Sequence, residues 1–109
     1  MNTVCLIGRL TRAPTTRFEG AGSQMTTATL EVPEPGKDGH TFRLYVPLIA
    51  WGKAADALGL LQAEDLVAVQ GKLTWRKTTD KHGQEKSTLA VNVREVQALE
   101  PSAALTGLP

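Results

Sequence analysis

The sequence predicts an all-β domain of five strands with one short helix, and three observations support this fold class. In residues 42–51, side chains alternate with the period of two that a strand requires. After Gly52 the spacing changes to that of a helix. Residues 66–79 then form a long alternating segment, which a turn sequence connects to another.

The first part of the chain predicts two strands and a smaller piece. Residues 3–12 are expected as the first strand, apolar on both faces, with Gly8 marking a bulge or a close backbone approach. Residues 15–18 have the length of a small edge strand only. Residues 24–32 are the second strand. Its predicted core face is Thr26, Ala28, Leu30 and Val32, and its outer face is Met25, Thr27, Thr29 and Glu31.

The third strand begins at Phe42, after a loop predicted over residues 33–39. Its predicted core face is Phe42, Leu44, Val46 and Leu48. The opposite face is Arg43, Tyr45, Pro47, Ile49 and Trp51, which combines a cation with two stacking rings. A short helix is expected over residues 53–61 from the spacing of Ala54, Ala57, Leu58 and Leu61.

Two long strands complete the fold. Residues 66–79 place Val67, Val69, Gly71, Leu73 and Trp75 on one face. Residues 80–84 are expected to form a hairpin tip, and residues 85–99 the last strand, with Leu89, Val91 and Val93 inward. Residues 101–109 are expected to be a short flexible tail after a domain of residues 1–100. Five strands with one helix between the third and the fourth match the plan of an OB-fold barrel.

Composition limits the class of protein. A chain of 109 residues is one domain, and a net charge of +1 means that any nucleic-acid site must come from local clustering of cations. The single cysteine excludes a disulfide within the chain. No apolar run is long enough to span a membrane, and no targeting segment is recognised. We therefore expect a cytoplasmic protein, associated with the nucleoid if it binds DNA.

Several segments in this order resemble bacterial single-stranded DNA-binding proteins over residues 2–100. They are NTVCLIGRLTRAPTTRF, WGKAA, LVAVQGKLTWRKTTDKHGQ and VREVQALE. The resemblance implies an OB fold, assembly as homodimers or homotetramers, and sequence-tolerant binding of single-stranded DNA in replication, recombination or repair. The chain looks like a tailless variant, because it ends at Pro109 without the family's long tail and acidic tip. Replication or repair proteins are further expected partners, but not through such a tip.

The resemblance assigns stacking roles to Trp51, directly before Gly52, and to Tyr45. The cations expected to contact the phosphate backbone of the DNA complete the predicted DNA-binding set: Arg9, Arg12, Arg43, Lys53, Lys72, Arg76 and Lys77. Arg17, Lys81 and Lys86 are further candidate cations, and for Lys81 and Lys86 ordinary solvated surface is the preferred interpretation. Three interpretations of Trp75 are left open, namely barrel core, subunit interface and DNA contact. The aromatic that the family often has near the hairpin tip is replaced here by Thr78 and Thr79.

Enzymatic and metal-binding classes find no support in the residues. The Gly-Lys pairs at 36–37, 52–53 and 71–72 lack the spacing and the following Ser or Thr of a phosphate-binding loop. His40 and His82 lie in predicted loops without partners at ligand spacing, and Cys5 is expected to be an inert core thiol. We expect no catalytic residue, metal or cofactor. Two alternatives to a DNA-protecting binder remain: a primosomal OB-fold protein of replication restart, and an OB module used for protein–protein contact.

Overall fold

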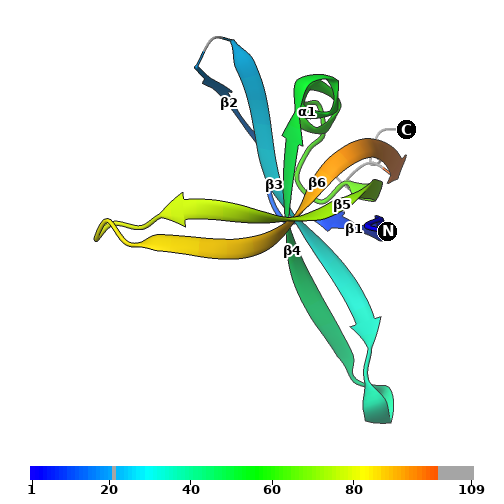
Figure 1. Cartoon of the computed structure of the whole chain (residues 1–109). Coiled ribbons are helices and arrows are strands. Elements are labelled where there is room, and N and C mark those ends of the chain that lie inside the picture. The colour runs from blue at the N-terminus through cyan, green and yellow to red at the C-terminus, as the bar shows by residue number, and fades with distance from the viewer. Residues whose placement is uncertain (21, 101–109) are drawn as a thin grey trace.

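The strands of the computed structural model, which describes residues 1–20 and 22–100, form one sheet that closes on itself (Figure 1). They are β1 (Val4–Leu10), β2 (Thr15–Glu19), β3 (Ser23–Pro35), β4 (Thr41–Trp51), β5 (Leu66–Thr79) and β6 (Glu85–Glu100). A 3-10 helix, η1 (Lys37–Gly39), precedes β4, and α1 (Gly52–Gly59) follows it. The sheet order is β1-β5-β6-β4-β3-β2, and a pairing of β1 with β3 closes the barrel. The predicted OB-type barrel of five strands, with a helix between the third and the fourth, is therefore confirmed, and β2 is the predicted small edge strand.

The barrel closes where β1 passes from β5 to β3. β1 pairs with β5 from Val4 to Arg9 and with β3 only at Arg9 and Leu10. At Gly8 the two backbones come so close that a Cβ atom would overlap the carbonyl oxygen of Glu31. Of the two predicted roles of Gly8, a bulge or a close backbone approach, the structure shows the close approach, and glycine is needed there for space.

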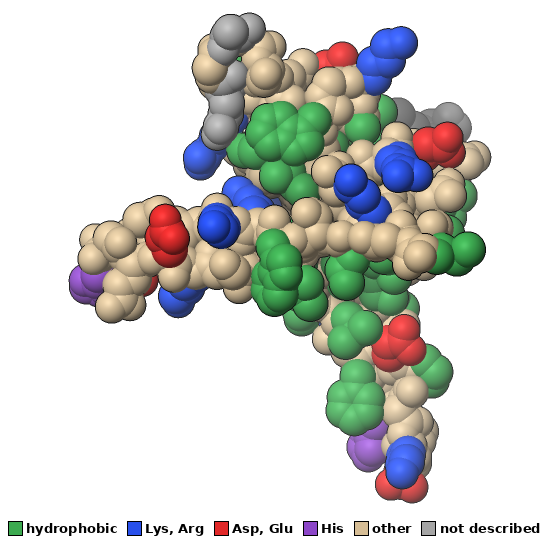
Figure 2. Space-filling model, in the orientation of Figure 1, with side chains coloured by type: hydrophobic (Ala, Val, Ile, Leu, Met, Phe, Trp, Pro, Cys, Tyr) green, Lys and Arg blue, Asp and Glu red, His purple; other side chains and the backbone are tan. Residues whose placement is uncertain are grey.

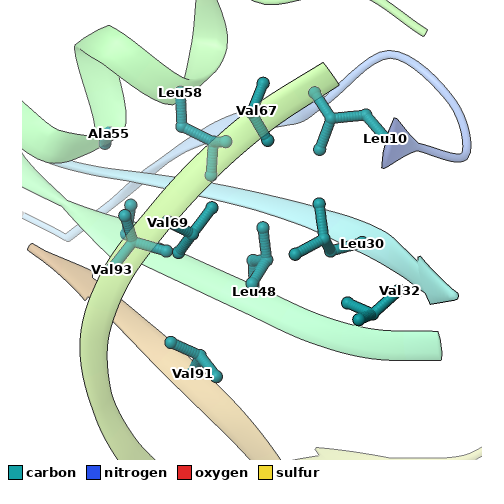
Figure 3. Close-up of a cluster of buried hydrophobic side chains, with 11 residues drawn as sticks. Leu10, Leu30, Val32, Leu48, Ala55, Leu58, Val67, Val69, Val91 and Val93 are labelled. Carbon is teal, nitrogen blue, oxygen red and sulfur yellow. The ribbon is translucent and has the colours of Figure 1, made fainter. Parts of the chain in front are cut away.

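The core lies inside the barrel and beneath α1. Figure 3 shows Leu58 of α1 within a cluster of buried aliphatic side chains that includes Leu30, Val67 and Val69. Thr26, a buried polar residue of β3, donates a hydrogen bond to the carbonyl oxygen of Ala55 at 2.9 Å. Its hydroxyl also lies 2.9 Å from that of Thr16. These bonds connect α1, β2 and β3, so the segment that follows β4 has a fixed position on the barrel.

The hairpins β2–β3, β3–β4 and β5–β6 extend past the barrel as separate arms (Figure 1). The prediction that Phe42, Leu44 and Leu89 are core residues is wrong, because these positions lie on the arms and are exposed. Leu73 and Trp75 are exposed for the same reason. Alternation identified the face that continues the barrel interior, but beyond the barrel that face has no opposing strand to cover it.

Burial on the outer face also differs from the prediction. Met25 and Ile49 are on the predicted outer faces of β3 and β4, yet both are buried, together with Ala90 of β6. Cys5, expected in the core, is exposed on β1. It pairs with Gln70, on the side of the sheet opposite the barrel interior.

Element boundaries differ by a few residues at several points. β3 continues to Pro35 through part of the predicted loop, and the rest of that loop contains η1. The helix ends at Gly59, and within it Ala55 is buried while Ala57 is exposed, which reverses the prediction for Ala57. β1 is shorter than predicted, β5 has the predicted bounds, and β6 extends to Glu100. The predicted tail, residues 101–109, lies outside the described residues. No helix in the described part of the chain is long and apolar enough to cross a membrane.

Replacing Gly8 with alanine should destabilise the protein, because the new methyl group would meet the backbone of Glu31 where the barrel closes. We expect Gly8→Ala to lower the free energy of unfolding by ~1–3 kcal/mol, the usual cost of overpacking. Chemical denaturation measures the change. Gln70→Ala on the exposed face of the neighbouring strand is the matched control and should have little effect. Equal stability of the two variants would contradict this account of barrel closure.

Candidate nucleic-acid interface

The outer face of the sheet brings an aromatic ring and a cation into one row. Trp51 of β4 pairs with Met25 of β3, which in turn pairs with Arg17 of β2. Directly paired residues share a face, and adjacent strands are about 4.8 Å apart, so Arg17 lies about 10 Å from Trp51 across the sheet. Trp51 remains 42% exposed. Gly52 follows it with a φ of 61°, a left-handed conformation that glycine adopts without strain and that turns the chain into α1.

The same face continues onto the β5–β6 arm. Ile49 pairs with Asn92 of β6, and Ala90 of β6 pairs with Thr74 of β5. The buried side chains of Met25, Ile49 and Ala90 fill the junction between the arm and the barrel. Figure 2 shows Lys and Arg side chains on either side of the hydrophobic ones where this arm leaves the barrel.

A groove of about 590 Å³ lies between this part of the sheet and the arm. We call it the tryptophan groove. Its lining residues are Arg17, Met25, Ile49, Trp51, Thr74, Trp75, Arg76, Lys77, Thr78 and Thr79. The lining provides three cations, two indole rings and three hydroxyl groups, and none of these described residues is acidic. A polyanion with flat aromatic groups fits this chemistry.

Three of the predicted site residues come together in the tryptophan groove: Trp51, Arg76 and Lys77. Lys53 lies next to it, because Lys53 and Trp51 both line a smaller hollow at the start of α1. Lys72 is exposed on the outer face of β5, on the same side of the strand as Arg76. Arg12 is exposed after β1 and lines none of these hollows.

The predicted residues Tyr45, Arg43 and Arg9 lie apart from the tryptophan groove. Tyr45 is 59% exposed on the face of β4 that carries Trp51, about 20 Å along the strand from it. Arg43 forms an ion pair with Glu31 at 3.1 Å. Arg9 donates a hydrogen bond to the carbonyl oxygen of Glu64 at 2.9 Å and lies 3.9 Å from a carboxylate oxygen of Glu100. Arg9 and Arg43 therefore have acidic or carbonyl partners within the chain.

Two residues of the groove, Arg17 and Trp75, lie outside the predicted DNA-binding set. Arg17 was only a further candidate cation, in the short segment of residues 15–18. Trp75 shares the alternation of buried residues, which favoured the core as much as any other role. The structure places it at 65% exposure and in the lining of the groove, so it is not a core residue. Within the described residues, no group of His, Cys, Asp and Glu side chains is arranged to hold a metal ion.

Comparison with known proteins assigns the family. The model of the Single-strand binding protein family matches residues 1–99. The chain belongs to the single-strand binding protein family. A single-stranded DNA-binding protein of Clostridium tetani is 34% identical over 92% of this chain and 71% of its own length. Single-stranded DNA-binding protein 3 of Clostridium acetobutylicum is 33% identical over 92% of this chain and 72% of its own length. Single-stranded DNA-binding protein A of Bacillus subtilis is 30% identical over 93% of this chain and 60% of its own length.

Proposed function

We propose that this member of the single-strand binding protein family binds single-stranded DNA in the tryptophan groove, with little preference for sequence. The observation that carries the proposal is the groove lining, which combines three cations and two indole rings and has no described acidic residue. Family membership supports the same ligand.

The chemistry of the groove suits an unpaired strand. Arg17, Arg76 and Lys77 attract the phosphates, and the hydroxyl groups of the neighbouring threonines donate hydrogen bonds to phosphate oxygens. Every base has a π-face, so an indole ring accepts any of them, and each stacked base contributes ~1–3 kcal/mol. A base paired within a duplex does not offer that face. The groove therefore selects for single strands without reading their sequence.

The bound DNA would continue from Trp51 to Tyr45 along the outer face of β4. The exposed ring of Tyr45 would stack a base several nucleotides away from the one at Trp51. Arg43 lies beyond Tyr45, but Glu31 offsets its charge. We therefore assign Arg43 a smaller share of the binding than Arg76.

The biological role that follows is protection of single-stranded DNA during replication, repair and recombination, in the compartment that holds the DNA. The protein acts by binding and not as an enzyme. The family match and the names of the relatives favour this role over a primosomal replication-restart protein or a protein–protein module. Titration with poly(dT), followed by intrinsic tryptophan fluorescence, tests DNA binding. Absence of saturable binding at low salt would leave only the protein–protein alternative.

We also propose that the protein is a homodimer or homotetramer, and that β1 lies in the contact between copies. Ile7 is 57% exposed, and Cys5 is exposed on the same face. Along Val4–Gly8 the edge of β1 away from β5 has no pairing in the described structure. An apolar face beside an open strand edge is a surface that a second copy can cover.

Replacing Trp51 with alanine should weaken binding to oligo(dT) by ~1–3 kcal/mol, because one base loses its stacking partner. The thermal midpoint should change little, since the ring is partly exposed and β4 ends there. Fluorescence anisotropy of a labelled oligonucleotide measures the affinity. Phe18→Ala is the matched control, because Phe18 is a highly exposed aromatic outside the tryptophan groove. A Trp51→Ala protein that is unfolded, or that binds as tightly as the parent, would remove Trp51 from the site.

Arg76→Gln should reduce the salt dependence of binding more than Arg43→Gln does. For single strands, log K falls with log[salt] with a slope of about −0.7 for each phosphate contact. Losing the contact of Arg76 should lower the slope by about 0.7, while Arg43 is already paired with Glu31 and should change it less. Affinities measured over a range of salt concentrations give both slopes. The reverse order would mean that the DNA follows the β3–β4 arm instead of the groove.

Ile7→Glu should shift the protein towards single chains, because a carboxylate would replace the exposed apolar side chain of β1 at the contact. Sedimentation velocity at micromolar concentration measures the shift. Leu60→Glu is the control, since Leu60 is also exposed but lies at the end of α1. If the parent sediments as a single chain, the oligomer proposal fails; if Ile7→Glu leaves an oligomer intact, β1 is not in the contact.

A further inference from the structure

Trp75 has the most exposed large apolar side chain of the β5–β6 arm, at 65%. We propose that Trp75 is a second base-stacking residue of the tryptophan groove, at the point where the DNA crosses the edge of β5. This inference rests on the single-stranded DNA binding proposed above. It adds a contact that neither the predicted site nor the family match assigns.

Trp75 is exposed and is not part of either buried hydrophobic cluster among the described residues. Its position continues the inward face of Val67 and Val69, but β5 has left the barrel by this point. The residue that pairs with it on β6, Leu89, is also exposed. An indole ring that contributes nothing to the core presents a large, rigid surface for a ligand.

The edge of β5 is open where Trp75 stands. β1 covers this edge only as far as Gly71, which pairs with Val4. Two residues farther along β5, the Asn2 side chain binds the backbone of Leu73. Its Oδ1 atom accepts a hydrogen bond from the Leu73 N–H at 2.8 Å, and its Nδ2 atom donates one to the Leu73 carbonyl at 2.9 Å. After Leu73 no strand in the described structure pairs with this edge. A polynucleotide can therefore pass over the edge of β5 next to Trp75.

A bound DNA strand would meet the two faces of β5 one after the other. Alternation places Arg76 on the outer face, beside the floor of the groove, and Trp75 on the opposite face. Both residues nevertheless line the groove, together with Lys77. A DNA strand bound in the groove would thus place a phosphate at Arg76 and stack the next base on Trp75.

The surroundings of Trp75 favour DNA over a protein partner. It is followed in sequence by Arg76 and Lys77, and Trp51 lies across the same groove. An apolar protein contact would have to desolvate these cations without a carboxylate from the groove to pair with them. A phosphodiester chain brings the opposite charge with each base.

The presence of only two tryptophans allows each ring to be tested separately. In Trp51→Phe the fluorescence comes from Trp75 alone, and in Trp75→Phe it comes from Trp51 alone. We expect oligo(dT) to quench both variants with the same midpoint and to protect both from acrylamide. If only Trp75→Phe responds, DNA binds at Trp51 and the inference about Trp75 is overturned. If neither responds and a labelled oligonucleotide shows no binding to the parent, the proposed function itself fails.

An affinity measurement gives an independent result. Trp75→Ala should weaken oligo(dT) binding about tenfold or more, as expected for one lost stacking contact. Its thermal midpoint and its sedimentation should match those of the parent. Leu89→Ala removes the exposed apolar side chain that pairs with Trp75 and should leave the affinity unchanged. Unchanged affinity of Trp75→Ala, or an altered oligomeric state, would overturn the proposal.

Discussion

The structure depends on the fact that the barrel is shorter than the strands that build it. β5 and β6 have 14 and 16 residues, yet their buried residues lie only between Val67 and Gly71 and between Ala90 and Val93. The remaining residues continue as a two-stranded arm, because antiparallel pairing satisfies their backbone groups without a core. The barrel closes beside Gly8, where β1 passes from β5 to β3. The arms then supply a binding surface that the barrel alone lacks.

That surface concentrates charge in a protein that has little of it overall. The net charge is only +1, and some cations are offset by carboxylates within the chain, as Arg43 is by Glu31. The tryptophan groove differs because its described lining has cations and no acidic residue. Local separation of charge therefore replaces a high net charge as the source of attraction for a polyanion.

Rings and cations meet in the groove through two kinds of contact. Arg17, Met25 and Trp51 share a row because β2, β3 and β4 pair in register, which is a local consequence of hairpin formation. Arg76 and Lys77 reach the same place only because β6 pairs with β4 and brings the β5–β6 arm over Ile49. The buried contact between Met25, Ile49 and Ala90 holds the two parts together.

The sequence by itself determined the order of the elements and the two faces of each strand, because alternation is a local property of the chain. For Gly8 it left a bulge and a close backbone approach open, and the contact with Glu31 decided between them. It also singled out Trp51, Arg76 and Lys77, which the structure brings into one groove. Only the tertiary structure decided which residues of an apolar face are covered: Leu48 is buried and Phe42 is exposed on the same face of β4. It also decided that Cys5 and Trp75 are exposed and that Met25 is buried. The physical reason is that burial depends on which strands lie opposite one another, and this is set by barrel closure and strand length, not by the residues within one strand.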